Sequence, residues 1–354
     1  MFKPEYNLTN SIIKKLIEIA EAKAVIEGAK ILPQQELKLR RQAIIRMTQS
    51  STAIEGNMLN IDQVEALYVN KKVDAPERDI YEVENYLKAL KYIDEVVKKK
   101  QPISEKIILS IHKLVTNRTL SADKSGVYRK TPVYVVKSMF GQVIEVVYTG
   151  PGANSVPALC ASLVKWIEDS EKENINPVII AGVVHQELAA IHPFADGNGR
   201  TARALATLIL YQRGYDFRRL FALEYYYNRE RQDYYKAINI GKKYEERNVD
   251  FTFWLEYFVE GFREEIENVK AKIKTLSRKV GNGKINDRVY LEPDQLKILD
   301  FLDQVGRIAT KDVVDILKCP KRTAQFHLLK LKNIKMIKQI GKGPASAYVL
   351  ESKK

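Results

Sequence analysis

Apolar positions near the start of the chain recur at the spacing of an amphipathic helix. Leu37, Ile44, Ile45 and Met47 fall on one face of a helix over residues 34–48. The stretches 83–97 and 103–115 repeat this pattern. The first half of the chain is therefore predicted to be mostly helical.

The spacing of apolar residues changes between Val127 and Val147 from a helical pattern to one typical of strands. Two β-branched runs, VYVV and VIEVV, flank the segment KSMFGQ, whose glycine suits a turn. This arrangement predicts a β-hairpin. The segment YTGPGANSVP then interrupts regular structure before a further helix near residues 159–167.

Helical patterns dominate the second half up to residue 280. Asn176 and Pro177 are a capping and first-turn pair that opens a helix ending near His192. The run ALATLILYQRGY follows Arg203 and predicts a helix that stops at Gly214. Residues 234–280 continue as helices, and GNGK at 281–284 is the best linker candidate.

Composition and charge narrow the class of protein. The 354 residues carry a net charge of +14 and are 45% hydrophobic and 29% charged, which excludes a disordered chain or a membrane protein. There is no apolar run long enough for a bilayer and no signal sequence, so a cytoplasmic protein without membrane contact is expected. Cys160 and Cys319 lie far apart, so disulfide and zinc chemistry are set aside.

The chain after the linker has a different composition. Residues 284–354 hold 15 Lys or Arg against 8 Asp or Glu, a net charge of +7. The pattern predicts helices over 294–304, 311–317 with Thr310 as cap, and 321–332, then two short strands around Lys338 and Tyr348 with GKGP between them.

This order of elements resembles a winged helix-turn-helix. In that family the third helix enters the major groove of DNA and the wing contacts phosphate. The resemblance implies that four side chains face DNA: Lys321, Arg322, Gln325 and His327. Winged helices also serve as protein docking or dimer modules, and surface lysines are often only solvated, so a DNA or a protein partner stays open.

The densest group of chemical side chains is HPFADGNGRTAR at residues 192–203. Gly197, Asn198 and Gly199 lie where a turn becomes a helix, so free N–H groups and the positive end of the helix dipole favour phosphate there. Arg200 and Arg203 share a face of the first turn and can hold a polyphosphate chain.

The same segment supplies a carboxylate and an imidazole. Asp196 offers a hard oxygen for Mg²⁺, and His192 can take a proton from an attacking hydroxyl. Each part alone could be ordinary: a helix boundary, a turn former, a solvated face, a core histidine. Their joint occurrence favours a site. A G-x-G-x-x-A match ending at Ala202 follows a helix rather than a strand, so no dinucleotide fold is expected, and no Walker sequence is present.

HPFADGNGRTAR resembles the signature of the Fic (filamentation, Fic/Doc) family, HxFx[DE]GNGRxxR, at every fixed position. The resemblance extends over most of residues 30–260, including HQELAAI before the signature and RQDYYKAI after it. It implies a helical core that transfers AMP from ATP to a hydroxyl of a target protein and releases pyrophosphate.

The resemblance also implies a role for each matching residue. His192 would be the general base, and Asp196 would bind Mg²⁺. The hairpin from Val133 to Val147 would be a flap that aligns the target as an added strand, or it is a plain structural hairpin. The expected ATP-binding set is Asp196, Gly197, Asn198, Gly199, Arg200, Thr201, Arg203, Tyr234 and Tyr235, together with Glu55. Within this set the two arginines clamp the β- and γ-phosphates, and the tyrosines belong to the nucleoside pocket unless they only pack in the core.

A second family-like motif lies upstream, in SSTAIEGN at residues 50–57. Ser51, Glu55 and Gly56 fit [ST]xxxE[GN], the inhibitory motif of the Fic class with an N-terminal regulatory helix. A Glu before a glycine helix stop lies at the dipole end that disfavours anions, so a cationic partner is expected, by analogy Arg203. The alternative is that Glu55 is an ordinary solvated residue.

The sequence therefore predicts a mainly α protein: a Fic-type helical core with a β-hairpin flap, followed by a small winged helix-turn-helix domain. The expected divisions are 1–100, carrying the inhibitory motif, 101–280 for the Fic core, and 284–354 for the winged helix. We expect an autoinhibited adenylyltransferase that uses ATP and Mg²⁺ on a Ser, Thr or Tyr hydroxyl of a target.

Several alternatives stay open. One is removal of AMP from modified targets, or transfer of another phosphate-linked group. Another is a transcriptional regulator whose Fic core senses nucleotide. The chain itself as target and a homodimer are also open.

Overall fold

The computed structural model describes residues 2–29, 31–139, 142–247, 249–281, 291–341 and 346–351. It divides into two compact units, one of residues 1–27 and 43–270 and one of residues 28–42 and 271–354. The helices on either side of residue 100, α4 (Glu77–Lys98) and α5 (Glu105–Val115), belong to the first unit and pack together. Of the linker candidate 281–284, Gly281 ends a helix, and the other three residues lie outside the described residues.

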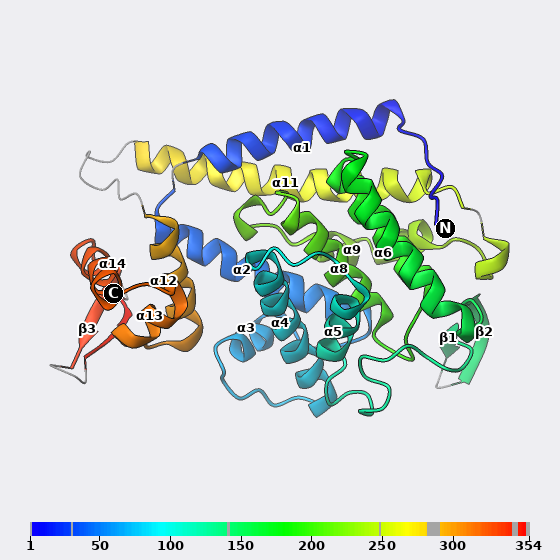
Figure 1. The fold of residues 1–354 in the computed structure, drawn as a ribbon, viewed down its shortest axis with the longest axis horizontal. Coiled ribbons are helices and arrows are strands. Elements are labelled where there is room, and N and C mark those ends of the chain that lie inside the picture. The colour runs from blue at the N-terminus through cyan, green and yellow to red at the C-terminus, as the bar shows by residue number, and fades with distance from the viewer. Residues whose placement is uncertain are drawn as a thin grey trace. The chain divides into compact units, whose positions relative to one another are not determined.

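Helices make up most of the chain as far as Gly281 (Figure 1). In chain order the elements are α1 (Asn10–Gly28), α2 (Pro33–Ile54), α3 (Ile61–Tyr68), α4 (Glu77–Lys98), α5 (Glu105–Val115), β1 (Tyr134–Met139), β2 (Gln142–Thr149), η1 (Ala153–Ser155), α6 (Val156–Lys172), α7 (Pro177–Ile191), α8 (Asn198–Gln212), η2 (Phe217–Arg219), α9 (Leu223–Arg229), α10 (Arg231–Ile238), η3 (Tyr244–Glu246) and α11 (Thr252–Gly281). The mainly helical fold expected from the sequence is confirmed.

Helix α7 forms the centre of the first unit. It is mostly apolar and buried on nearly all sides, as expected for a helix enclosed by others, and it packs against α6 and α8. The predicted start is confirmed, because the Asn176 side chain accepts a hydrogen bond from the Val178 N–H at 2.9 Å. The Trp254 Nε1–H of α11 donates to the Gly182 carbonyl at 2.7 Å, which fixes α11 against α7. Helix α7, which precedes the signature, is therefore packed between α11, α6 and the signature-bearing helix α8.

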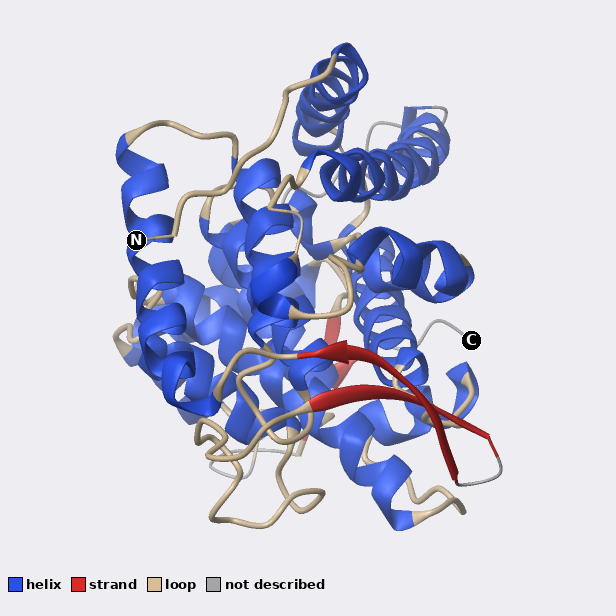
Figure 2. Ribbon diagram, turned by 90° about the vertical axis from the view of Figure 1, so that its right-hand side faces the viewer, coloured by secondary structure: helices blue, strands red, loops and turns tan. Residues whose placement is uncertain are grey.

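The predicted hairpin is present as the antiparallel pair β1 and β2 (Figure 2). Tyr134 pairs with Thr149, and Met139 pairs with Gln142, so the strands extend into the segment expected to be the connection. Phe140 and Gly141 lie outside the described residues. Apolar side chains are exposed on both strands, at Tyr134, Val135, Val136, Ile144 and Val146. A flap that receives a target segment remains a prediction.

The second unit contains α12 (Pro293–Val305), α13 (Thr310–Leu317), α14 (Lys321–Asn333) and the antiparallel strands β3 (Ile337–Ile340) and β4 (Ala347–Leu350). The three helices and two strands lie where the sequence predicts them. The proposed cap of α13 is wrong, because the helix begins at Thr310 and its N-cap is Ala309. The carboxylate of Asp312, in the first turn of the helix, accepts a hydrogen bond from the Ala309 N–H at 2.7 Å and so caps the start of α13.

The expectation that His327 faces DNA is also wrong. His327 is only 5% exposed and lies in the apolar stripe of α14 that includes Ala324, Leu328 and Leu331. These positions repeat at helical spacing and pack on the core of the second unit, which turns the imidazole inward. The other three residues of the expected DNA-facing set, Lys321, Arg322 and Gln325, are exposed.

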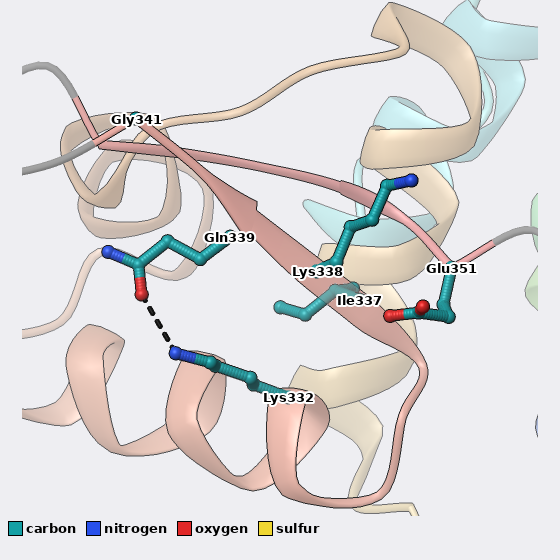
Figure 3. A pocket seen from close by; sticks show the side chains of 6 residues that line it. All are labelled: Lys332, Ile337, Lys338, Gln339, Gly341 and Glu351. Atoms are coloured by element: carbon teal, nitrogen blue, oxygen red, sulfur yellow. Dashed lines mark hydrogen bonds between the residues drawn. The ribbon is translucent and has the colours of Figure 1, made fainter.

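A shallow hollow beside β3 is lined by Lys332, Ile337, Lys338, Gln339, Gly341 and Glu351 (Figure 3). The Lys332 Nζ donates to the Gln339 side-chain oxygen at 2.9 Å. None of the residues expected to carry chemistry lies in this hollow. Within the part of the chain that the structure describes, no helix is both long enough and apolar enough to cross a membrane.

Candidate active site

His192 lies directly after the last turn of α7. Its backbone is left-handed (φ 49°, ψ 58°), and its N–H donates to the Leu188 carbonyl, which ends the helix. The Nδ1 atom is 3.0 Å from the Ala189 carbonyl and must donate to it, so Nε2 keeps a free lone pair. Burial lowers the pKa of His192, although the bond to Ala189 acts in the opposite direction. A neutral imidazole with a free Nε2 can accept a proton.

Arg129 holds the loop after His192, and sequence reasoning did not identify it. Its Nε–H donates to the His192 carbonyl at 2.8 Å, and its other nitrogens donate to the Thr131 and Pro151 carbonyls at 2.9 and 2.6 Å. The guanidinium therefore joins the signature loop to both ends of the hairpin. A single arginine outside any motif gave no signal in the sequence.

His112 of α5 supports the same loop from another side and was likewise not identified. Its ring stacks on Phe194 with centroids 3.6 Å apart. Nδ1 accepts from the Gly126 N–H at 2.9 Å, so Nε2–H donates to the Asp196 carbonyl at 2.9 Å. Burial lowers the pKa of His112 to about 4, and the neutral ring keeps both hydrogen bonds above that pH.

The turn into α8 has the form expected of an anion nest. Gly197 has φ 75°, and a Cβ there would meet Thr116 at 2.6 Å, so only glycine fits. Asn198 closes the turn, because its side chain accepts from the Phe194 N–H and donates to the Phe194 carbonyl, both at 2.9 Å. The first-turn N–H groups that follow have no intrahelical partners and form a natural anion site.

Thr201, expected among the ATP-binding residues, lies in this first turn. Its hydroxyl donates to the Gly197 carbonyl at 2.8 Å, and the side chain is buried. The Thr201 hydroxyl therefore makes its hydrogen bond to the backbone of the same helix turn.

The segment from Ser51 to Gly56 lies against this nest. Arg203 is 2% exposed, and its Nη2 is 2.8 Å from the Glu55 Oε1. It also donates to the Ser51 hydroxyl at 2.9 Å and to the Ser51 carbonyl at 2.8 Å. Gly56 has φ 95° and ends the helix there. The predicted contact between Glu55 and Arg203 is confirmed.

Glu55 also reaches the first turn of α8. A Cβ added to Gly199 would collide with the Glu55 carboxylate oxygen. The carboxylate thus occupies space directly over the positive end of the helix, where an anionic ligand would be stabilised. Glycine at this position is what allows the approach.

Arg200 and Asp196 form the other part of the site. Arg200 is buried, and its Nη1 is 3.3 Å from Glu82 of α4. Asp196 is partly exposed and lies 3.7 Å from Arg200 and 3.3 Å from Arg78. Both signature arginines are therefore paired with carboxylates from outside α8.

A divalent cation fits this arrangement only as a partner of bound phosphate. No group of three or more His, Cys, Asp or Glu side chains among the described residues could hold a metal. Asp196 alone offers a partly exposed carboxylate beside the anion nest. Mg²⁺ is commonly held by one or two carboxylates together with substrate phosphates and waters, and this donor set suits that mode.

The two tyrosines of α10 have different surroundings. Tyr234 is buried, and its ring stacks on Tyr227 with centroids 4.8 Å apart. Its hydroxyl oxygen lies 3.1 Å from the His185 Nε2 and 3.5 Å from the Arg203 Nη1. Tyr235 is half exposed and donates to the Ile54 carbonyl at 2.9 Å. Tyr234 thus packs in the core beside Arg203, whereas Tyr235 contacts the end of α2.

A buried carboxylate lies behind Ser51 and Arg203. The Tyr86 hydroxyl donates to Glu224 at 3.0 Å, and both side chains are fully enclosed. Burial raises the pKa of Glu224 from its ordinary 4.5 to about 7. The folded protein therefore holds a proton here that the unfolded chain loses at lower pH, so stability falls as the pH rises through this interval.

We expect Glu224→Gln to remove this pH dependence. Relative to wild type, the free energy of unfolding of the variant should gain about 2–3 kcal/mol between pH 5 and pH 8. Denaturant unfolding at several pH values measures the difference, with exposed Glu95→Gln as the matched control. Parallel stability curves for wild type and Glu224→Gln would contradict the expectation.

Residues 102–210 match the Fic/DOC family model. The structure resembles the crystal structure of a Fic family protein from Desulfovibrio desulfuricans G20, with 25% identity, a TM-score of 0.65 and coverage of 100% of this chain and 99% of that one. Fic-1 from C. elegans shares the fold at 24% identity, with a TM-score of 0.59 over 75% of this chain and 73% of that one. A helical core with this signature is typical of the Fic class, and residues 102–210 of this chain form a Fic/DOC family domain.

Two curated relatives are protein adenylyltransferases named Fic. The protein from Drosophila grimshawi is 27% identical over 204 residues, which are 57% of this chain and 40% of that protein. The protein from Nematostella vectensis is 29% identical over 215 residues, which are 59% of this chain and 46% of that protein. The match thus spans less than half the length of these relatives.

Proposed function

We propose that this chain is an autoinhibited protein adenylyltransferase that moves AMP from ATP to a hydroxyl of a target protein. The observation that carries the proposal is the complete Fic signature folded around an anion nest, with a neutral His192 beside it. The relatives' names support the reaction class.

The chemistry follows from the positions of the side chains. The Nε2 of His192 takes the proton of the target hydroxyl, whose oxygen attacks the α-phosphorus of ATP while the bond to pyrophosphate breaks. The α8 N-terminus, Arg200 and Arg203 hold the phosphate chain and stabilise its charge. When bound, Mg²⁺ at Asp196 would neutralise phosphate charge. Of the two tyrosines of α10, Tyr235 is the one with an exposed surface for the nucleoside.

The hairpin is the proposed docking element for the target. Its exposed apolar side chains and antiparallel strands offer an edge to which an extended segment can add. Arg129 links the ends of the two hairpin strands to His192. A target segment aligned on these strands would therefore have a defined position relative to the His192 imidazole.

Inhibition is proposed to arise from the position of Glu55. Its carboxylate lies over the α8 N-terminus and pairs with Arg203, where the terminal phosphate of ATP would bind. ATP bound beside the carboxylate must place its phosphates elsewhere, which turns the α-phosphate away from in-line attack. Binding without turnover is the expected resting state.

The proposal is tested by incubating the protein and a cell lysate with labelled ATP and Mg²⁺, then identifying modified peptides. AMP on a Ser, Thr or Tyr of the chain or of a lysate protein supports it. Loss of existing AMP or a different mass increment would indicate one of the alternative reactions instead.

For the second unit we expect binding to duplex DNA through α14. Lys321 and Arg322 are exposed at the start of that helix, as phosphate contacts require. Reversing both charges in the full chain should lower affinity and reduce the magnitude of the salt-dependence slope by about 2. Mobility shifts across salt concentrations measure this.

Lys14→Glu with Lys88→Glu serves as the matched control, because both lysines are exposed in the first unit. Absence of any mobility shift for the full chain at low salt would assign the second unit to protein contacts.

A further inference from the structure

Four side chains beside the nest form a closed ring of alternating charge. Arg78 and Glu82 lie one turn apart on α4, and Asp196 and Arg200 belong to the signature. Arg78 is 3.3 Å from both Asp196 and Glu82. Glu82 is 3.3 Å from Arg200, and Arg200 is 3.7 Å from Asp196. Each carboxylate is therefore shared between two guanidinium groups.

The ring has a buried half and an open half. The side chains of Glu82 and Arg200 are 6% and 1% exposed, whereas those of Asp196 and Arg78 are 40% and 65% exposed. A buried charge is costly unless it is paired, so Arg200 must keep an anionic partner. Glu82 is the nearer partner, and Asp196 is left with the weaker contact.

The Glu82 carboxylate is itself fixed in place. Its Oε2 accepts from the Asn57 side-chain N–H at 3.0 Å, while Oε1 faces the arginines. Asn57 follows Gly56 directly and also donates to the Asp79 carbonyl at 3.0 Å. The Glu82 side chain on α4 is thus anchored by Asn57, the residue that follows Gly56.

We propose that Glu82 is a positioning residue that holds Arg200 away from Asp196 and so keeps the Asp196 carboxylate available to a divalent cation. The inference rests on the proposed use of Mg²⁺ and ATP at this site. Without the charge of Glu82, Arg200 and Arg78 share one remaining carboxylate, that of Asp196. Two guanidinium groups drawn to Asp196 then compete with the cation.

The test measures ATP binding by calorimetry over a series of Mg²⁺ concentrations, using the full chain with Glu55→Gly so that the nest is open. Adding Glu82→Gln, which keeps the shape of the side chain, should raise the half-saturating Mg²⁺ concentration about tenfold, as expected for one charged contact. In an Arg200→Ala background the same substitution should cause a much smaller shift. Glu84→Gln, on the exposed side of α4, is the matched control and should cause none.

An unchanged Mg²⁺ requirement in folded Glu82→Gln, or an equal shift with and without Arg200, overturns the inference. If thermal melts show that Glu82→Gln does not fold, Glu82→Asp replaces it, because the shorter side chain draws the carboxylate back from Arg200 and should shift the requirement in the same direction, and no shift there overturns the inference. If the Glu55→Gly protein binds Mg²⁺ and ATP but transfers no AMP, the proposed function fails while the Mg²⁺ shift still decides the role of Glu82.

Discussion

Glu55→Gly is expected to raise AMP incorporation about a hundredfold, because correct positioning of reacting groups can carry several kcal/mol of a barrier. The substitution removes the carboxylate that lies over the α8 N-terminus and pairs with Arg203 at 2.8 Å. The γ-phosphate of ATP can then take the guanidinium, and the α-phosphate can turn toward His192. Transfer of label from ATP to the protein itself or to a lysate target measures the effect.

Two further variants separate release of Arg203 from other causes. Adding Arg203→Ala to Glu55→Gly should lower incorporation again, because the phosphate clamp is lost. Glu55→Gln keeps the length of the side chain without its charge and should also activate. Glu55 lies beyond the last residue of α2, so neither Glu55→Gly nor Glu55→Gln falls within a helix. Equal incorporation by wild type and Glu55→Gly would leave SSTAIEGN as an ordinary helix end.

The sequence carried much of the site because its main chemistry lies in two short segments. Residues 192–203 place His192, the nest and two arginines within twelve positions, and the resemblance of SSTAIEGN to the family motif indicated that Glu55 meets Arg203. Local capping rules also located the start of α7 at Asn176. These features depend on neighbours in sequence, which a pattern records directly.

The residues that sequence reasoning did not find act across the fold. The separations in sequence are 63 positions for Arg129 and His192, 84 for His112 and Asp196, and 118 for Glu82 and Arg200. Only the packing of the fold brings these residues together. His327 failed for a related reason. Its polar type suggested an outer surface, whereas its position on α14 put it among the apolar residues that pack on the core. The alternative of core packing for Tyr234 was the better description for the same reason.

His192→Ala is expected to lower AMP transfer by the Glu55→Gly protein about a thousandfold, within the range that a positioned general base contributes. The free Nε2 is the proton acceptor in the proposed reaction, and no bond of the nest or of the arginines involves this ring. ATP affinity should therefore change little, because the α8 N-terminus, Arg200 and Arg203 are intact. The loss should appear in kcat rather than in nucleotide binding.

Single-turnover transfer and calorimetric ATP binding on the same preparations distinguish the two quantities. His327→Ala is the matched control, because it makes the same change in the second unit, and thermal melts report whether each variant folds. Loss of ATP binding together with transfer would indicate that His192 shapes the nest through the loop that Arg129 holds. Transfer by His192→Ala at the rate of its parent would remove the imidazole from the mechanism, since a proton acceptor that can be deleted without cost is not the base.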